Sequence, residues 1–307
     1  MRTRSLGAVA FAVAASLGVM GASTPAGADA ARSARAVLPE QVIEAQTQTA
    51  QTPEGAVGYR ELGAGSPLVL IMGLGGSMDE WPPSFVAALA SRHHVVLVDN
   101  AGVGSTALIS PLTITTMADE VSALMSDLDL GRAAVLGWSM GGMEAQALAV
   151  LHPGQVSKLV LAATQPGSGH ALPIPPAAAA KAASTNPAEV LSVLFPSTAL
   201  SALGVYVKAI LRYPDSYRAS PAVVAEQGTA ISQWMAGDDA AGRRFEHVKA
   251  PTLVADGTED QLNPVANDRA LAGAVHASKL VLYRGAGHAF LFQDSTRFLP
   301  VVERFLG

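Results

Sequence analysis

Short apolar runs alternate with stretches of helical spacing along most of this chain. The runs are as short as β-strands and rich in Val and Leu, and PLVLIM at 67–72 is apolar throughout, as in a strand buried on both faces. This alternation predicts a parallel sheet with right-handed crossovers. The predicted strands are 57–62, 67–72, 94–98, 133–136, 158–163, 251–255 and 278–283, and the predicted helices are 83–91, 115–128, 140–151 and 290–306.

The alternation is interrupted once, after the run at 158–163. From residue 165 to about 248 the chain carries a proline cluster and mainly helical patterns, and strands resume at 251. We therefore predict one α/β domain over residues 55–307, with a helical cap inserted at about 166–248. An insertion at this point lies over the carboxyl ends of the strands, where open α/β sheets bind ligands.

The composition excludes several classes of function. Half of the 307 residues are hydrophobic, the net charge is −5 and no run of Lys or Arg occurs, so the electrostatic footprint of a nucleic-acid-binding protein is absent. The chain has no cysteine, which excludes disulfides, thiolate metal sites and a cysteine nucleophile. We expect no nucleic-acid partner, no metal and no cofactor.

The first 30 residues have the pattern of a secretory signal peptide. Arg2 and Arg4 precede an uncharged apolar stretch at 6–22, and two small-x-small cleavage sites follow within 26–30. We predict cleavage at one of them, a secreted, extracytoplasmic protein and no stable membrane anchor after cleavage; an uncleaved anchor is the alternative. Residues 31–54, rich in Ala, Gln and Thr, are interpreted as a flexible leader.

A G-x-S-x-G motif at 137–141 joins a predicted strand directly to a predicted helix. So tight a turn gives its central residue, Ser139, a strained conformation with positive φ, and small residues two before and two after it avoid clashes with neighbouring backbone. Met140 begins the helix and offers a backbone N–H to a developing oxyanion. The motif alone also occurs by chance, so it is the strand–turn–helix context that predicts Ser139 as a nucleophile.

One of the seven histidines is placed to act as a base for this serine. His288 follows the last predicted strand in R-G-A-G-H at 284–288, where two glycines let the loop bend over the sheet edge. A structural role is the alternative for a lone histidine, and the position after the last strand argues against it. The other six lie at element ends, in the insertion or in loops: His93, His94, His152, His170, His247 and His276.

An acidic residue that orients the histidine should follow a strand located between the nucleophile and the base. Asp256, Glu259 and Asp260 follow the predicted strand at 251–255. Asp256 adjoins the strand and could instead hold the turn through backbone hydrogen bonds. Spacing alone favours Asp260 over Asp256 without excluding Asp256.

A glycine-rich loop, M-G-L-G-G-S at 72–77, follows the second predicted strand. Its glycines let the backbone approach a ligand closely, and the N–H of Leu74 is the candidate second donor to an oxyanion. A plain glycine-rich turn is the alternative. A phosphate-binding loop is excluded because no G-K-[ST] follows.

With these residues in place, the chain resembles the α/β-hydrolase superfamily over about residues 55–307, in the branch that contains esterases, lactonases, C–C bond hydrolases and cofactor-free haloperoxidases. G-W-S-M-G-G at 137–142 is similar to the family's nucleophile elbow, and G-H at 287–288 is similar to its histidine loop. G-T-E-D-Q-L-N-P at 257–264 is similar to the family's G-x-x-D-x-x-x-P acid loop, and this similarity assigns the acid to Asp260.

Two segments depart from the family pattern. D-N-A-G-V-G-S at 99–105 resembles the family's D-x-R-G-x-G-x-S turn, with Ala101 where Arg is usual and Ser105 one place early. The oxyanion loop opens with Met72-Gly73 where the family has His-Gly. Because that histidine supports the loop and is not a triad member, the resemblance implies that catalysis survives, and it leaves loop rigidity and substrate preference open.

The resemblance implies a mostly parallel eight-stranded sheet flanked by helices, and a serine hydrolase that cleaves a carboxylic ester or lactone of a small, apolar substrate through an acyl-enzyme. Together with the signal-peptide pattern, it predicts a secreted serine hydrolase. His288 would take the proton from Ser139, the N–H groups of Leu74 and Met140 would hold the oxyanion, and Asp260 would fix the imidazole tautomer. A cofactor-free perhydrolase or haloperoxidase, or a C–C bond hydrolase, with the same triad is the alternative, followed by a non-catalytic binding protein. A serine nucleophile argues against a haloalkane dehalogenase or an epoxide hydrolase. The oligomeric state is left open.

The cap and the predicted loops supply candidates for a substrate pocket. Large aromatic residues in the cap could contact a substrate, and packing within the cap is their alternative role. The candidate pocket residues are Gly73, Trp138, Phe195, Tyr206, Trp234 and Phe290.

Overall fold

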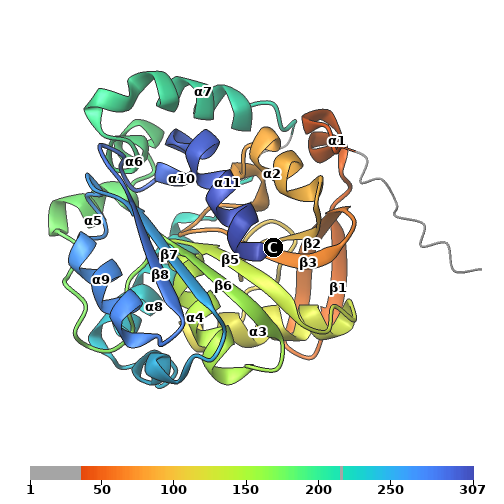
Figure 1. Ribbon diagram of the computed structural model, residues 1–307, viewed down its shortest axis with the longest axis horizontal. Coiled ribbons are helices and arrows are strands. Elements are labelled where there is room, and N and C mark those ends of the chain that lie inside the picture. The colour runs from red at the N-terminus through yellow and green to blue at the C-terminus, as the bar shows by residue number, and fades with distance from the viewer. Residues whose placement is uncertain (1–35, 215–216) are drawn as a thin grey trace, which may run out of the picture. The chain divides into compact units, whose positions relative to one another are not determined.

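An eight-stranded sheet forms the centre of the computed structural model, which describes residues 36–214 and 217–307 (Figure 1). The strand order is β1-β2-β4-β3-β5-β6-β7-β8, with β2 antiparallel to β1 and β4 and all other pairs parallel. The predicted mostly parallel sheet is confirmed, while the predicted signal peptide lies outside the described residues. The strands are β1 (Gln48–Thr52), β2 (Gly55–Gly63), β3 (Ser66–Ile71), β4 (His93–Val98), β5 (Ala133–Trp138), β6 (Val156–Ala162), β7 (Thr252–Gly257) and β8 (Ser278–Tyr283).

Successive side chains of the central strands point into two separate hydrophobic cores. Leu68 and Leu70 of β3 belong to one core, and Val69 and Ile71 belong to the other, because neighbouring side chains of a strand face opposite sides of the sheet. Both sides are covered by helices, which is why the strands are continuous apolar runs. Helices α2 (Pro83–Ala90) and α11 (Ser295–Leu306) cover the first side, and α3 (Ile114–Asp127), α4 (Met140–Leu151) and α9 (Val265–Ala274) cover the second.

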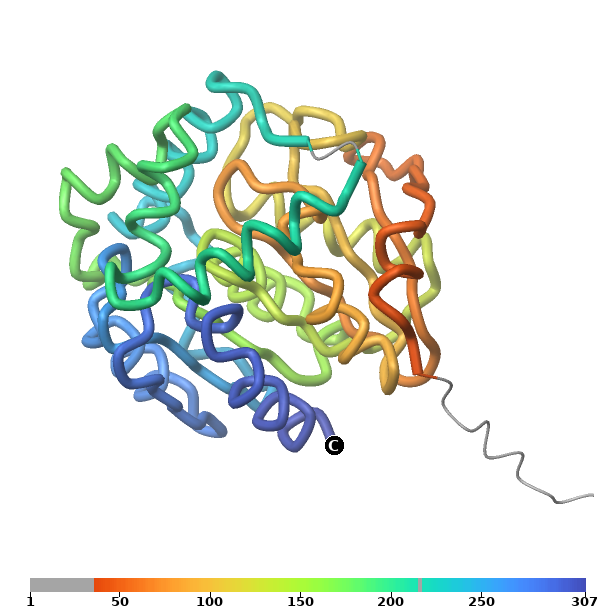
Figure 2. The backbone as a smooth tube through the Cα atoms, turned by 90° about the horizontal axis from the view of Figure 1, so that it is seen from above, coloured from red at the N-terminus to blue at the C-terminus, as the bar shows by residue number. Residues whose placement is uncertain are grey.

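A helical cap is inserted between β6 and β7, as predicted. Its first helices, green in Figures 1 and 2, contribute Phe195 and Tyr206 to the first core, while its last helix contributes Ile231 and Trp234 to the second. The cap therefore packs against both layers of the domain. Its elements are α5 (Pro176–Ala182), α6 (Pro187–Leu194), η2 (Ser197–Ala199), α7 (Leu200–Ile210), α8 (Pro221–Ala236) and η3 (Gly242–His247).

Two cap helices are unusually apolar. Within the described ranges, no single helix is both long and apolar enough to cross a bilayer. In these ranges only one pair of helices, taken together, is long and apolar enough: Pro187–Leu194 and Ser197–Ile210. The chain bends by 102° at the break between them.

The segment before β2 is part of the fold, which corrects the prediction that all of 31–54 is a flexible leader. Helix α1 (Pro39–Glu44) buries Val42, and β1 pairs along its length with β2. Ala50 alone is buried in β1. An edge strand with one buried side chain leaves almost no hydrophobic pattern, so sequence periodicity could not reveal it.

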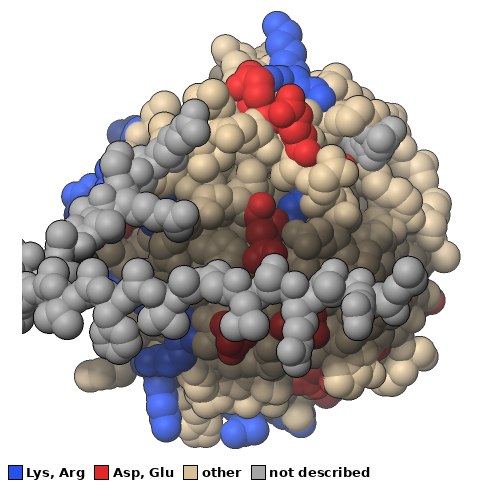
Figure 3. Space-filling view, turned by 90° about the vertical axis from the view of Figure 1, so that its right-hand side faces the viewer, with Lys and Arg blue, Asp and Glu red and all other residues tan. Residues whose placement is uncertain are grey.

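Charged side chains form small mixed groups on the face shown in Figure 3. Two ion pairs join distant parts of the chain: Arg60 lies 2.6 Å from Asp79, and Arg212 of the cap lies 2.9 Å from Glu40 of α1. The Arg212–Glu40 pair is exposed and contributes little stability by itself, whereas the side chains of Arg60 and Asp79 are only 13% and 7% exposed. The Arg212–Glu40 pair shows that the cap contacts the N-terminal helix.

Candidate active site

Ser139 lies in a strained turn between the end of β5 and the start of α4. Its backbone has φ 57° and ψ −120°, so the predicted positive φ is confirmed. Its N–H donates to the carbonyl oxygen of Ala162, at 2.9 Å, which ties the turn to β6. Such a conformation costs on the order of 1–3 kcal/mol for a residue other than glycine and persists only where the surroundings impose it.

Glycines around Ser139 allow the turn to pack. A Cβ on Gly137 would lie 2.1 Å from the carbonyl oxygen of Gly141, and a Cβ on Gly141 would lie 2.3 Å from that of Ile71. A Cβ on Gly142 would lie 2.6 Å from the Cβ of Thr164. These distances are too short for any side chain, so each position requires glycine for helix α4 to sit against the strands.

His288 and Asp260 form a buried hydrogen-bonded pair. His288 Nδ1 lies 2.6 Å from Asp260 Oδ2, and the two side chains are 2% and 0% exposed. Asp260 Oδ1 also accepts hydrogen bonds from the N–H groups of Leu262, at 2.6 Å, and Asn263, at 2.9 Å. Because an ionised carboxylate only accepts hydrogen bonds, Nδ1 carries the imidazole proton and Nε2 is left as the acceptor.

The histidine loop is fastened by two side chains from other parts of the site. Trp138 Nε1 donates to the carbonyl oxygen of His288, at 3.0 Å. Gln293 accepts from the N–H of Gly287, at 3.2 Å, and donates to the carbonyl oxygen of Gly285, at 3.1 Å. The single helix predicted for 290–306 is interrupted just after Gln293, giving α10 (Phe290–Gln293) and α11.

Asp256, the alternative acid, holds the acid loop instead of contacting the histidine. Its Oδ1 accepts from the N–H of Gly257, at 2.6 Å, and its Oδ2 accepts from Asn263 Nδ2, at 2.9 Å. Burial, with the nearby carboxylates of Asp260 and Asp268, raises the pKa of Asp256 well above its usual range. The hydrogen-bond geometry thus places Asp260 on His288 and Asp256 behind the turn.

Two backbone segments flank Ser139, the start of α4 and the glycine-rich loop. Met140 is the first residue of α4, so its N–H has no acceptor within the helix. On the other side, a Cβ on Gly73 would lie 3.2 Å from Ser139 Cβ, which shows how closely the glycine-rich loop approaches the serine. Leu74 follows in a turn that Gly76 N–H closes on the carbonyl oxygen of Gly73, at 3.2 Å.

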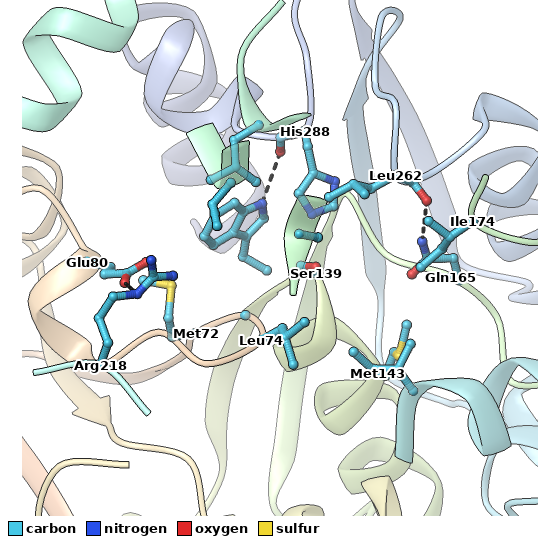
Figure 4. Close-up of a pocket in the computed structure, with 16 residues that line it drawn as sticks. Met72, Leu74, Glu80, Ser139, Met143, Gln165, Ile174, Arg218, Leu262 and His288 are labelled. Atoms are coloured by element: carbon cyan, nitrogen blue, oxygen red, sulfur yellow. Dashed lines mark hydrogen bonds and ion pairs between the residues drawn. The ribbon is translucent and has the colours of Figure 1, made fainter. Parts of the chain in front are cut away.

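Ser139 and His288 line the same cavity, which has a volume of about 60 Å³ (Figure 4). Figure 4 shows the imidazole above Ser139, with Glu80 and Arg218 on one side of the cavity and Gln165 on the other. Most of the wall is apolar. The lining residues are Met72, Gly73, Leu74, Glu80, Trp138, Ser139, Met143, Gln165, Ile174, Ala182, Val190, Leu194, Arg218, Ile231, Leu262 and His288.

An ion pair in the cavity wall was not foreseen from the sequence. Arg218 Nε lies 3.0 Å from Glu80 Oε1, and the arginine side chain is 43% exposed. Burial raises the pKa of Glu80, and Arg218 opposes that shift. Glu80 lies in η1 (Met78–Glu80) and Arg218 lies in the cap, so no local pattern relates them.

Four of the six predicted pocket residues do not line this cavity. Gly73 and Trp138 do. Phe195 packs on Tyr206, with ring centroids 5.4 Å apart, and Phe290 stacks on Tyr283. Trp234 is fully buried and donates to the carbonyl oxygen of Gln165, at 3.1 Å. Phe195, Tyr206 and Trp234 pack where the cap meets the core, Phe290 packs within the core, and mainly aliphatic residues face the cavity.

In the part of the chain that the structure describes, no group of three or more His, Asp or Glu side chains is arranged to hold a metal ion. The carboxylates of Asp256 and Asp268 lie close together behind the acid loop. Both accept a hydrogen bond from Asn263 Nδ2, at 2.9 and 3.0 Å.

A mostly parallel sheet that carries a strand–turn–helix serine, together with a histidine bonded to an aspartate, defines the class of α/β-fold hydrolases. Residues 66–295 match the alpha/beta hydrolase fold family, and the chain belongs to that family. It is a hydrolase.

Three known proteins illustrate the range of this similarity. The chain is 30% identical over 251 residues to "Putative carbamate hydrolase RutD" of Caulobacter sp. (strain K31), covering 78% of this chain and 90% of that protein. It is 28% identical over 264 residues to a pimeloyl-[acyl-carrier protein] methyl ester esterase of Aeromonas hydrophila subsp. hydrophila, covering 82% of this chain and all of that protein (100%). The enol-lactonase structure from Burkholderia xenovorans LB400 is similar with a TM-score of 0.68 and 25% identity, covering 84% of this chain and 99% of that chain.

Proposed function

We propose that this hydrolase cleaves a carboxylic ester or lactone of a small, mainly apolar substrate through an acyl-enzyme on Ser139. The observation that carries the proposal is the 2.6 Å hydrogen bond between Asp260 and His288, whose ring shares a cavity with the strained Ser139. Support also comes from relatives whose names describe a methyl ester esterase, an enol-lactonase and a carbamate hydrolase. Attack on a carbonyl carbon is common to all three kinds of substrate.

In the first half of the reaction, His288 Nε2 takes the proton from Ser139 Oγ as the oxygen attacks the carbonyl carbon. The carbonyl oxygen becomes an oxyanion, and the N–H groups of Leu74 and Met140 donate to it. Asp260 holds the proton on Nδ1 and stabilises the imidazolium. The tetrahedral intermediate then expels the alcohol oxygen, which receives the proton from Nε2.

In the second half, water replaces the alcohol. His288 takes one proton from water, and the hydroxide oxygen attacks the acyl carbon. Collapse of the second tetrahedral intermediate breaks the bond to Ser139 Oγ and returns the proton to it. The products are a carboxylic acid and an alcohol, or a hydroxy acid when the substrate is a lactone.

The wall of the cavity favours an apolar acyl group. Met143, Ile174, Val190 and Leu262 present aliphatic or thioether surface near the reacting groups. Glu80 and Arg218 supply the charged part of the wall and already pair with each other.

An activity-based probe tests the proposal directly. A fluorophosphonate should label the folded protein once, on Ser139, and labelling should disappear in Ser139→Ala and fall steeply in His288→Ala, because the base activates the hydroxyl. Ser192→Ala, which alters an exposed serine, is the matched control and should label normally.

A panel of chromogenic esters and lactones, with and without peroxide, completes this test. If turnover requires peroxide, the activity is perhydrolysis and not hydrolysis. A folded wild type that takes no probe and turns over no ester would refute the hydrolytic assignment of Ser139.

We further propose that the protein is exported and cleaved within residues 26–30. The support is the sequence pattern of two arginines, an apolar stretch and small-x-small sites. N-terminal sequencing of the protein from the culture medium should begin at residue 29 or 31. An intact Met1 on membrane-bound protein would contradict export by cleavage.

A further inference from the structure

The side chain of Gln227 joins the cap to the glycine-rich loop beside Ser139. Gln227 lies on α8 and is 0% exposed. Its Oε1 accepts a hydrogen bond from Gly75 N–H, at 2.8 Å, and its Nε2 donates to the carbonyl oxygen of Ala101, at 3.2 Å. One buried amide therefore connects the cap, the oxyanion loop and the turn after β4.

Other contacts press the same part of the cap onto the loop. Ala219 N–H donates to the carbonyl oxygen of Gly75, at 3.0 Å, and Arg218 forms an isolated antiparallel bridge with Gly76. Gly75 has φ +67°, and a Cβ on it would lie 2.9 Å from Val224 Cγ2. Glycine at this position lets α8 approach the loop closely enough for the Gln227 bond.

The held peptide is adjacent to the proposed oxyanion donor. Gly75 N–H belongs to the peptide between Leu74 and Gly75, the central peptide of the turn from Gly73 to Gly76. The preceding peptide joins Gly73 to Leu74 and carries Leu74 N–H, and a Cβ on Gly73 would lie 3.2 Å from Ser139 Cβ. If Gly75 N–H lost its acceptor it would be buried without a partner, so the loop would shift to restore one, and a shift at Leu74 and Gly75 would displace the adjoining peptide that carries Leu74 N–H.

No polar side chain within the loop itself could replace this support. Met72 opens the loop with an apolar side chain, and its carbonyl oxygen accepts from Asn100 Nδ2, at 2.9 Å. Ser77 accepts from Asp79 N–H, at 3.3 Å, at the start of η1. The acceptor for the central peptide therefore comes from the cap.

We propose that Gln227 is a positioning residue that keeps Leu74 N–H directed at the oxyanion, and thereby couples the seating of the cap to the rate of acyl transfer. This inference rests on the proposed hydrolase function. The cap is then part of the catalytic machinery on its α8 side, in addition to forming a wall of the cavity.

The test compares two substitutions that separate positioning from stability. Gln227→Leu removes both hydrogen bonds, and kcat for a chromogenic ester should fall about 10- to 100-fold with KM within about twofold, because an oxyanion donor acts in the transition state and its complete loss costs about 10²–10³. Gln227→Glu keeps an acceptor for Gly75 N–H while placing a carboxyl group in a buried site, so it should lose stability and retain kcat within about threefold of wild type.

Gln233→Leu, an exposed position on the same helix, is the control and should change neither quantity. If Gln227 had a purely structural role, activity would follow stability, and Gln227→Glu would be as inactive as Gln227→Leu. That result would overturn the proposal. Unchanged kcat in a folded Gln227→Leu overturns it as well. Fluorophosphonate labelling of the wild type separates these outcomes from failure of the proposed function, since that failure removes labelling from the wild type itself.

Discussion

Replacing Asp260 by asparagine isolates the role of the carboxylate with little change of shape. The side chain is 0% exposed and accepts from Leu262 N–H, Asn263 N–H and His288 Nδ1. In Asp260→Asn the amide oxygen can still accept from the two backbone groups, so the acid loop should keep its form. The amide nitrogen then faces Nδ1 and donates to it, which moves the imidazole proton to Nε2.

A histidine protonated on Nε2 cannot accept the proton of Ser139, and the imidazolium also loses its counter-charge. We expect kcat to fall by about 10⁴, equivalent to about 5.4 kcal/mol in the activation free energy, with KM changed by less than about threefold. Steady-state hydrolysis of a chromogenic ester measures both constants, and circular dichroism checks that the variant is folded.

Asp256→Asn is the matched control, because Asp256 is the other carboxylate of the same loop. Its carboxylate is hydrogen-bonded to Gly257 and Asn263 and not to the histidine. Asp256→Asn should therefore lower the free energy of unfolding and leave kcat much closer to the wild-type value than Asp260→Asn does. A large loss of kcat in Asp256→Asn together with a small one in Asp260→Asn would show that the acid has been assigned to the wrong residue.

Two further predictions concern stability. In Gly141→Ala the new Cβ meets the carbonyl oxygen of Ile71, at 2.3 Å, so urea unfolding should show a loss of about 1–3 kcal/mol or more, whereas Gly154→Ala, where a Cβ meets nothing within 4 Å, should change stability by less than about 0.5 kcal/mol; equal losses would contradict the packing argument. Burial raises the pKa of Glu120 from 4.5 to about 8, so the folded state binds the extra proton and the free energy of unfolding should fall as pH rises from about 4.5 to about 8. In Glu120→Gln the free energy of unfolding should fall less over this pH range, by on the order of a few kcal/mol. Parallel pH profiles of stability for wild type and variant would refute this prediction.

Short sequence motifs were enough to predict the reacting groups. The strand–turn–helix context identified Ser139 and its positive φ, and the position after the last strand singled out His288. Spacing left Asp256 and Asp260 open, and the loop pattern at 257–264 favoured Asp260, which the structure places on His288. Each signal lies within a few residues of the group concerned, where short-range geometry decides the conformation.

Signals of this kind failed in two places where hydrogen bonds, and not a periodic set of buried side chains, define the element. Val42 is the one buried residue of α1 and Ala50 the one buried residue of β1, so the N-terminal segment left no periodic pattern. The predicted helix at 290–306 is broken beside Gln293, whose side chain turns back to the histidine loop. In both cases tertiary contacts, and not local preference, set the boundary of the element.

The sequence by itself determined the parallel sheet, the inserted cap and the residues of the serine, acid and histidine loops, because apolar periodicity and glycine spacing act over short stretches of chain. Only the tertiary structure decided what surrounds the site. It buried Phe195, Tyr206, Trp234 and Phe290 in packing, brought Glu80 and Arg218 into the cavity wall, and set Gln227 against Gly75, 152 residues away. Those contacts depend on where the cap packs against the two layers of the domain. That position is determined by side chains from many parts of the chain that become buried together.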